Sequence, residues 1–202
     1  NFSYAYDHFH FLFKNFSLKI EKGDKILLKG PSGIGKSTLV KAVSGRLDTY
    51  DGRIRINDKD IRDIAMESLK NYCLYVGQEE KLFTGSIFEN IVQVAPDKER
   101  FDDVSRVTMA DEIWKYRRDG ENSALLEGAS NLSGGEKARI VLARALYKQP
   151  AILIIDETLS SVSEAMETAI LENLMAMPEL TLIYITHRNR EKNFKKIIEF
   201  RK

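Results

Sequence analysis

Cysteine is almost absent from this sequence, since its 202 residues include a single one, Cys73. One cysteine cannot form a disulfide within the chain, which excludes an internally cross-linked fold and favours a reducing compartment. Long apolar runs are absent too, because the longest ones, at 151–155 and 180–185, are far shorter than the roughly 20 residues of a membrane-spanning helix. The sequence therefore predicts a globular fold with neither an internal disulfide nor a transmembrane helix.

An excess of charge of one sign is also missing. Lys and Arg number 31 against 30 Asp and Glu, which gives a formal net charge of +1. Nucleic-acid-binding domains usually carry a basic excess, so this balance argues against a nucleic-acid partner. The basic end, 188–202, is compatible with a partner-binding tail, although a solvated helix and strand edge is the simpler interpretation. The composition, with 43% apolar residues, is that of an ordinary globular domain.

Apolar periodicity predicts strands and helices along the whole chain. Strands are expected at 2–6, 16–20, 25–29, 53–56, 72–76, 151–155 and 181–185. Helices are expected at 37–44, 135–147 and 164–175, and within a helical stretch from about 88 to 114. Gly23-Asp24 is typical of a hairpin turn between the second and third strands. Because apolar strands alternate with helices, we expect an α/β fold whose mainly parallel sheet is covered on both faces, with an antiparallel β subdomain at its N-terminus.

A glycine-rich loop lies between the third predicted strand and the first predicted helix. The residues from Gly30 to Ser37 fit the pattern G-x-x-x-x-G-K-[ST], and they lie in the strand–loop–helix context that this pattern requires. Its glycines let backbone N–H groups face phosphate oxygens, Lys36 adds a positive charge, and the Ser37 hydroxyl can ligate Mg²⁺. A plain glycine-rich turn is the alternative. The sequence predicts a nucleoside triphosphate site formed by Gly30, Pro31, Ser32, Gly33, Ile34, Gly35, Lys36, Ser37 and Thr38.

Two adjacent carboxylates follow the apolar run 151–155, which is expected to be a buried strand. A buried parallel strand carries its last side chains to the C-terminal edge of the sheet, where ligands bind in such folds. With the phosphate loop in the same sheet, we expect Asp156 to hold the Mg²⁺ shell and Glu157 to orient and polarise the attacking water. Solvated turn residues are the alternative interpretation of this pair.

The segment Leu132-Ser-Gly-Gly-Glu136 precedes a predicted helix and lies shortly before the acidic strand end. In this order it resembles the signature motif of the ABC ATPase family, although a bare Ser-Gly-Gly is a common way to begin a helix. Ser133, Gly134 and Gly135 would open a helix whose N–H groups favour an anion. The resemblance implies a head-to-tail dimer with a second ABC ATPase domain, in which each signature closes on the ATP held by the other subunit.

The same resemblance implies the organisation of the whole chain. Residues 1–202 are expected to form one ABC ATPase domain, built on a P-loop NTPase core with a helical subdomain inserted at about 86–134. ATP and Mg²⁺ are the implied cofactors.

Three further positions match landmarks of that family. Tyr4 looks like the aromatic residue that stacks on adenine, with Tyr6 as the fallback and ordinary strand packing as the alternative. Gln78 matches the Q-loop glutamine, which contacts Mg²⁺ and water and senses the transmembrane partner. His187 follows the second apolar strand and matches the switch histidine that contacts the γ-phosphate, whereas an unmatched histidine there would be a surface residue. The resemblance implies that the catalytic residues are Lys36, Gln78, Glu157 and His187, and that the Mg²⁺ ligands are Ser37, Gln78 and Asp156.

Three positions depart from the family pattern. Ser163 stands where the D-loop at 160–163 usually ends in Asp, which puts the usual contact across the dimer in question. Gly77 stands where Pro is usual, and Glu136 replaces the commoner Gln. None of these departures removes a group that ATP hydrolysis needs.

The segment 82–91 is similar to the stretch that follows the Q-loop in exporters. Importers usually have an Asp after the switch histidine, where this chain has Arg188, and residues 123–131 loosely resemble the exporter loop before the signature. The resemblance therefore implies the ATP-driven motor of an exporter at the cytoplasmic face of the cell membrane. Its transmembrane domain is expected to be fused N-terminally on the same chain.

Two alternatives from other classes stay open on the sequence. The first is a soluble ABC ATPase that acts on DNA or the ribosome, but about a hundred residues separate the phosphate loop from the signature, without the long insertions of relatives that work on DNA. The second is a regulatory domain that binds ATP without hydrolysing it. The presence of Glu157 and His187 argues against this alternative, whereas Ser163 keeps it open.

Overall fold

The computed structural model describes residues 1–5, 11–77, 80–93 and 95–201. Its largest sheet has five parallel strands in the order β12-β3-β11-β10-β7. These strands are β12 (Lys196–Glu199), β3 (Lys25–Lys29), β11 (Thr181–Ile185), β10 (Ile152–Asp156) and β7 (Cys73–Val76). Every residue of β11 is buried, as is usual for a central strand that is covered on both faces.

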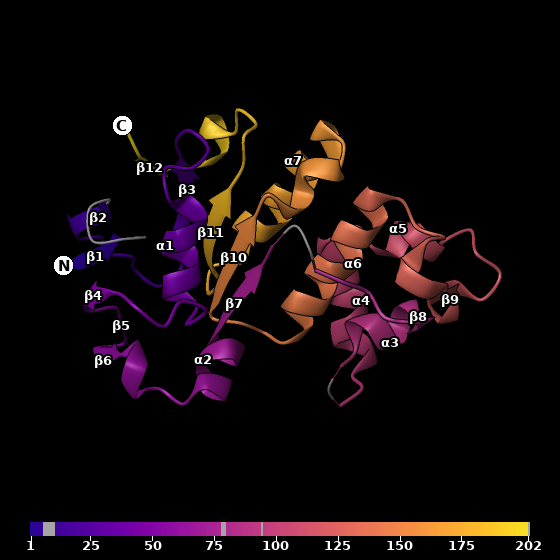
Figure 1. The fold of residues 1–202 in the computed structure, drawn as a ribbon. Helices are drawn as coiled ribbons and strands as arrows, with labels where there is room; N and C mark the ends of the chain where they lie inside the picture. Colours follow the sequence, from indigo (N-terminus) through magenta and orange to yellow (C-terminus); the bar gives the residue numbers. More distant parts are fainter. Residues whose placement is uncertain (6–10, 78–79, 94, 202) are drawn as a thin grey trace.

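Helices cover both faces of this sheet (Figure 1). On one face, Ile26 and Leu28 of β3 belong to a buried cluster that includes residues of α1 (Lys36–Val43) and α2 (Met66–Tyr72). On the other face, Leu27 belongs to a cluster with α6 (Gly134–Tyr147) and α7 (Glu164–Met175). Because neighbouring side chains of a strand point to opposite faces, the apolar run of β3 contributes to both cores.

A second sheet, of three antiparallel strands, lies at the N-terminal end of the molecule. Its order is β2-β1-β4, with β1 (Phe2–Ala5), β2 (Phe11–Phe16) and β4 (Asp51–Gly52). The rings of Phe2 and Phe13 lie 5.6 Å apart and pack with Leu39 of α1. A small antiparallel pair, β5 (Arg55–Ile56) and β6 (Lys59–Asp60), and the short 3₁₀ turn η1 (Ile61–Asp63) precede α2.

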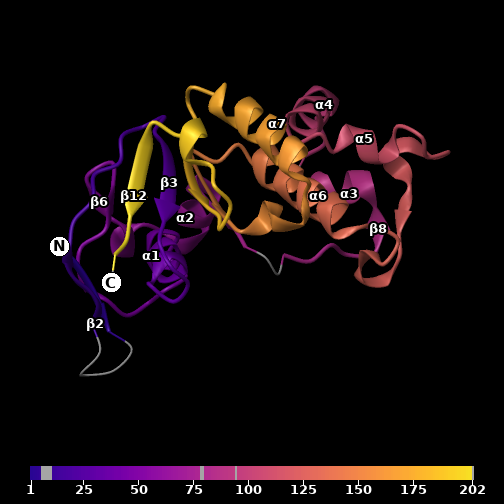
Figure 2. The ribbon, with the colours of Figure 1, turned by 90° about the horizontal axis from the view of Figure 1, so that it is seen from above.

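The regular elements of the chain between β7 and α6 are mainly helices, and they lie at the end of the molecule opposite to β1 and β2 (Figures 1 and 2). Ser86 and Glu89 form a reciprocal capping box at the start of its first helix, and Asp97 caps the second. The first two helices pack on α6, which joins this part to the sheet. The elements here are β8 (Gly85–Ser86), α3 (Ile87–Ile91), α4 (Lys98–Val107), α5 (Asp111–Trp114), η2 (Gly120–Asn122), β9 (Ala124–Leu125) and η3 (Glu127–Ala129).

The α/β fold class predicted from the sequence is confirmed: the main sheet is parallel, and the N-terminal sheet is antiparallel. The helix predicted at 164–175 and the strand predicted at 181–185 have the expected bounds. The basic end contributes β12, which pairs in parallel with β3 at the sheet edge, and the short turn η5 (Glu191–Asn193). Within the described residues, none of the helices combines the length and the apolar character needed to cross a bilayer.

Two predictions for the N-terminal region are wrong. The strand expected at 16–20 is absent, because β2 pairs with β1 over Phe11–Phe16 and Leu18 lies exposed beyond its end. The turn at Gly23-Asp24 does form, and the N–H of Asp24 donates to the carbonyl of Glu21 at 3.1 Å. It connects strands of two different sheets, however, so it is not a hairpin turn.

Candidate nucleotide site

The predicted phosphate loop runs from the end of β3 into α1. Gly30, Gly33 and Gly35 have φ angles of 148°, 77° and 103°, a region that residues with a Cβ rarely adopt. A Cβ on Gly35 would also lie 2.7 Å from Leu12 and 2.8 Å from Phe13, so β2 can approach the loop because this position is glycine. In the described part of the chain no side chain caps α1, which leaves its N-terminus suited to an anion.

The ammonium group of Lys36 is held by this loop. The residue is 6% exposed, and its Nζ donates to the carbonyl oxygens of Gly30 at 2.7 Å and Pro31 at 3.0 Å. Because carbonyl oxygens carry only partial charges, they position the cation without neutralising it. Of the other predicted loop residues, Ser32 and Ser37 are exposed, whereas Ile34 and Thr38 are half-buried.

Asp156 is the last residue of β10 and is almost buried, with 6% of the residue exposed. The neighbouring strand β7 supplies Tyr75, whose hydroxyl donates a hydrogen bond to Oδ2 of Asp156 at 2.9 Å. Burial and the adjacent Asp156 carboxylate raise the pKa of Tyr75, so its hydroxyl keeps its proton and remains a donor. The carboxylate is thus oriented by a neutral partner that sequence analysis did not identify.

Glu157 follows directly and has a φ of 56°, the left-handed conformation that is uncommon for residues with a Cβ. Its N–H donates to the carbonyl of Ile185 at 3.0 Å, so the turn after β10 is fastened to the end of β11. Its carboxylate Oε1 lies 2.6 Å from Nε2 of His187, which comes from the turn after β11. The two residues predicted to act on water and on the γ-phosphate therefore touch each other, although they lie 30 positions apart in the sequence.

Several of these side chains line one hollow of about 530 Å³ at the C-terminal edge of the sheet. Ser37, Asp156 and Glu157 offer it hydroxyl and carboxylate oxygens, which are the ligands that Mg²⁺ prefers. In the described ranges, no group of three or more His, Cys, Asp and Glu side chains could hold a metal alone. That donor set fits Mg²⁺, which usually takes one or two carboxylates and completes its shell with water and phosphate oxygens. Gln78, the third predicted ligand, lies outside the described residues.

The signature segment forms the N-terminus of α6. Ser133 caps this helix in a reciprocal box, in which its backbone N–H donates to Oε2 of Glu136 at 2.7 Å and its hydroxyl accepts from the N–H of Glu136 at 3.3 Å. A Cβ on Gly134 would lie 3.2 Å from the Cβ of Ser161, and one on Gly135 would lie 3.0 Å from the Ser161 carbonyl. Both glycines therefore permit the close approach of the segment after β10.

The signature and the phosphate loop begin helices that cover opposite faces of the sheet (Figure 1). The loop begins α1, which packs on the face of Ile26 and Leu28, whereas Ser133 begins α6, which packs on the face of Leu27. Ser133 is exposed, and its hydroxyl donates to Oε2 of Glu136 at 2.8 Å.

Tyr4, the predicted adenine contact, is half-buried in β1 and packs against the cluster of Phe2, Phe13 and Leu39 beside α1. This is the strand packing that the sequence left open as an alternative, and the stacking role stays a prediction. The fallback residue, Tyr6, lies outside the described residues.

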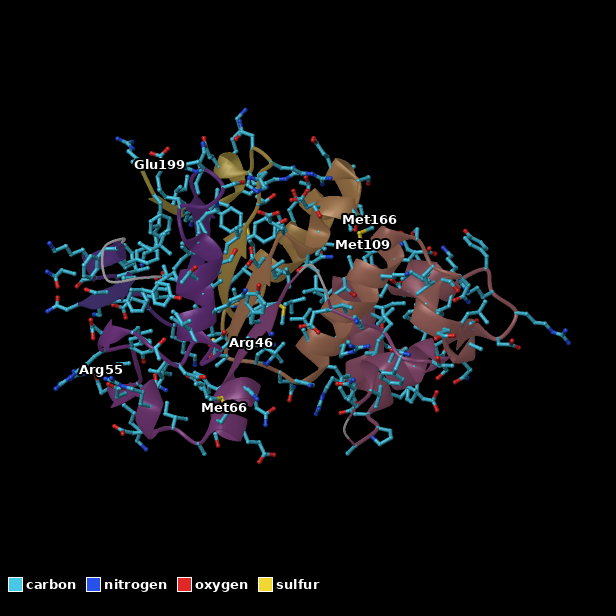
Figure 3. All side chains as sticks on the ribbon, viewed as in Figure 1. Arg46, Arg55, Met66, Met109, Met166 and Glu199 are labelled. Atoms are coloured by element: carbon cyan, nitrogen blue, oxygen red, sulfur yellow. The ribbon has the colours of Figure 1, made fainter. Side chains whose placement is uncertain are left out.

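Arg46, like Tyr75, was not identified by sequence analysis. Its guanidinium carbon lies 4.8 Å from the centre of the Tyr75 ring, and it lines the same hollow as Asp156. Arg46 is labelled in Figure 3. No local signal marks either residue, because each acts through a partner that is distant in the sequence. A sequence motif finds neighbours along the chain, whereas Tyr75 and Asp156 lie 81 positions apart.

Known proteins are similar to this chain over most of its length. The sequence profile described as "ABC transporter" matches residues 13–160. The chain is 36% identical over 185 residues to Multidrug resistance protein 1 of Entamoeba histolytica, which covers 89% of this chain and 14% of that protein. It is 34% identical over 188 residues to the Lactococcin-G-processing and transport ATP-binding protein LagD of Lactococcus lactis subsp. lactis, which covers 92% of this chain and 27% of that protein.

A solved structure is similar as well. It is described as a bacterial Atm1-family ABC exporter with ATP bound, and it superimposes with a TM-score of 0.85 at 30% sequence identity, over 92% of this chain and 33% of that one. The chain thus spans at most about a third of the length of each of these relatives.

Proposed function

Since this chain belongs to the ABC transporter family, we propose that it is the ATP-binding and ATP-hydrolysing motor domain of an exporter. The observation that carries this proposal is the 2.6 Å contact between Glu157 and His187 beside the hollow that Ser37 and Asp156 also line. A domain that merely binds nucleotide has no need for a carboxylate held in this way near the phosphate site. In the same proposal, residues 86–134 form the inserted helical subdomain.

Each site residue has a distinct part in the proposed reaction. The amides of the phosphate loop bind the phosphates, and Lys36 exchanges its carbonyl partners for oxygens of the β- and γ-phosphates. Ser37 and Asp156 would hold Mg²⁺, which would neutralise part of the charge that develops on the phosphates. Glu157 accepts a hydrogen bond from the attacking water and orients it, while His187 holds the carboxylate and faces the γ-phosphate.

The site is incomplete in one copy of the chain. Ser133 and the α6 N-terminus offer donors to an anion, yet α6 covers the opposite face of the sheet from the phosphate loop. A second ABC ATPase domain, packed head to tail, would bring its own signature to the ATP bound here. ATP-driven closure and hydrolysis-driven opening of this dimer would then move the transmembrane domain.

The length of the relatives supports a proposal for the partners and the location. Since those relatives are several times longer, we propose that a transmembrane domain accompanies this domain on the same chain and that this domain lies at the cytoplasmic face of the membrane. Relatives named for multidrug resistance and for lactococcin-G processing and transport do not favour an ATPase acting on DNA or the ribosome, nor a purely regulatory domain.

The replacement Lys36→Ala tests the nucleotide site. It removes the positioned charge, so binding of ATP–Mg²⁺ measured by isothermal titration calorimetry should become undetectable, and hydrolysis of ATP should disappear with it. Lys59→Ala, which removes an exposed lysine from β6, is the matched control and should leave both quantities unchanged. Equal affinities for the wild type and the Lys36 variant would overturn the assignment of the loop.

A further inference from the structure

Glu167 is a buried carboxylate that the proposed reaction does not use. It lies on α7, its side chain is 1% exposed, and three donors surround it. Oε1 accepts from the Tyr184 hydroxyl at 2.6 Å, and Oε2 accepts from Nη2 of Arg190 at 2.8 Å and from Nη1 of Arg188. A buried charge is costly unless it is paired, so a fully buried glutamate with three partners marks a built arrangement rather than a chance contact.

The network keeps this carboxylate ionised. Burial acts to raise the pKa of Glu167, but the hydrogen bonds from Arg190, Tyr184 and Arg188 outweigh it and hold the pKa below its ordinary value. Burial and Glu167 together raise the pKa of Tyr184, which therefore remains a neutral donor.

Two of the three partners closely follow the predicted switch histidine in the sequence. Arg188 follows His187 directly, and Arg190 stands two positions further along. Arg188 and Arg190 stand on either side of Asn189, and both donate to Glu167 on α7. These bonds attach the turn that carries His187 to that helix. The imidazole at the start of this turn contacts Glu157, so the fastening acts on a residue of the site.

Arg188 also bonds to the segment that follows Glu157, the residue that His187 contacts. Its Nη1 donates to the carbonyl of Val162 at 2.8 Å, and its Nη2 donates to the carbonyl of Ser160 at 2.7 Å. Both carbonyls belong to the turn that begins directly after Glu157, which contains η4 (Thr158–Ser161). One guanidinium therefore joins the Glu157 turn to the His187 turn, and Glu167 holds that guanidinium.

The geometry points to Glu167 as a positioning residue for ATP hydrolysis: by holding Arg188, it sets His187 and the turn after Glu157 at the separation that their contact requires. This inference rests on the proposed function. It predicts that replacing Arg188 lowers ATP hydrolysis more than replacing Arg190 does. The other side-chain bonds of Arg190 are to residues of α7, at Thr168 Oγ1 (3.0 Å) and the Glu164 carbonyl (3.3 Å), so Arg190 does not reach the turn after Glu157.

The first test is Glu167→Gln, which keeps the shape of the side chain and removes its charge. A small displacement of Glu157 or His187 should lower kcat for ATP hydrolysis by about 10- to 100-fold, because misplacement by about an ångström has effects of this size. KM for ATP–Mg²⁺ should stay within about twofold, since the phosphate loop lies on other elements. The matched control is Glu172→Gln, an exposed glutamate on the same helix, which should behave as the wild type.

The second test compares Arg188→Lys with Arg190→Lys. Both replacements weaken the pairing of Glu167, but only the first also breaks the bonds to Ser160 and Val162. Arg188→Lys should therefore lower kcat by at least about fivefold more than Arg190→Lys at comparable thermal stability. A purely structural role predicts that kcat follows the folded fraction in both variants, and that result would overturn the inference.

A spectroscopic readout separates this inference from the proposed function. The chain has three histidines, so the imidazole resonances of His187 can be assigned with a His187→Gln variant. Glu167→Gln and Arg188→Lys should shift these resonances and Glu172→Gln should not, whether or not the wild type hydrolyses ATP. Unchanged resonances in folded Glu167→Gln and Arg188→Lys proteins would refute the positioning role, whereas an inactive wild type would refute the proposed function. If Glu167→Gln fails to fold, the comparison of Arg188→Lys with Arg190→Lys still tests the positioning role.

Discussion

A single hydroxyl orients the carboxylate at the end of β10. Tyr75 donates to Asp156 in a nearly dry environment, where a carboxylate that loses a donor is poorly solvated. Tyr75→Phe should therefore lower the free energy of unfolding by about 2 kcal/mol, the size usual for a hydrogen bond to a charged group. Urea denaturation without nucleotide measures this loss. Tyr116→Phe, which removes a hydroxyl from a residue that is 89% exposed, should cause almost no change, and equal effects of the two would contradict the assignment.

Among single residues, the sequence identifies those site residues that belong to contiguous motifs. Lys36 and Ser37 belong to one motif, and the apolar run before Asp156 predicts the strand that does end at this residue. The residues that hold the site in shape could not be predicted in this way. Glu167 meets Tyr184 over 17 positions and Arg190 over 23, and no local pattern distinguishes a buried glutamate on an amphipathic helix from an exposed one.

The N-terminus of α6 has an acidic residue where it is proposed to face a phosphate. Burial acts to raise the pKa of Glu136, but its hydrogen bonds with Ser133 outweigh this and lower the pKa, so the residue is charged. Glu136→Gln keeps the capping box, because glutamine serves equally at this position, and it removes a negative charge beside the anion. The dissociation constant of the ATP-bound dimer should therefore fall by about 2- to 5-fold for each of the two signature segments that carries the replacement, as expected from a charge at a helix end.

Sedimentation equilibrium at several ATP concentrations measures this change. The control is Glu89→Gln, because Glu89 makes the same capping box with Ser86 at α3, a helix that is not part of the predicted signature. If both variants dimerise as the wild type does, the N-terminus of α6 does not face a phosphate.

Long elements with a clear period could be predicted, and short or half-exposed ones could not. The helix at 164–175 and the strand at 181–185 combine length with many buried residues. In contrast, α2 buries Leu69 alone among its residues, so the sequence has no apolar stripe to indicate a helix there. The edge strand β12 is half-exposed, and its pairing with β3 depends on a contact between the two ends of the chain.

For the whole molecule, the proposed function requires two copies of the domain. Glu157→Gln should retain ATP because water is no longer oriented for attack, and the closed pair should accumulate. Multi-angle light scattering should therefore give twice the mass of one chain in saturating ATP–Mg²⁺ and the mass of one chain without nucleotide. A monomer under both conditions would contradict the head-to-tail arrangement. Adding Lys36→Ala to this variant should abolish the dimer, because the nucleotide is then lost.

The strand order has a consequence for how the protein is made. β11 is synthesised after β3 and β10, yet it lies between them and hydrogen-bonds to both. A ribosome-bound chain that ends before Thr181 therefore lacks the centre of its main sheet, and the loops after β3 and β10 have nothing to hold them side by side. The nucleotide site can therefore assemble only after translation has passed Ile185, when β11 joins the loop that follows β3 to the carboxylates that follow β10.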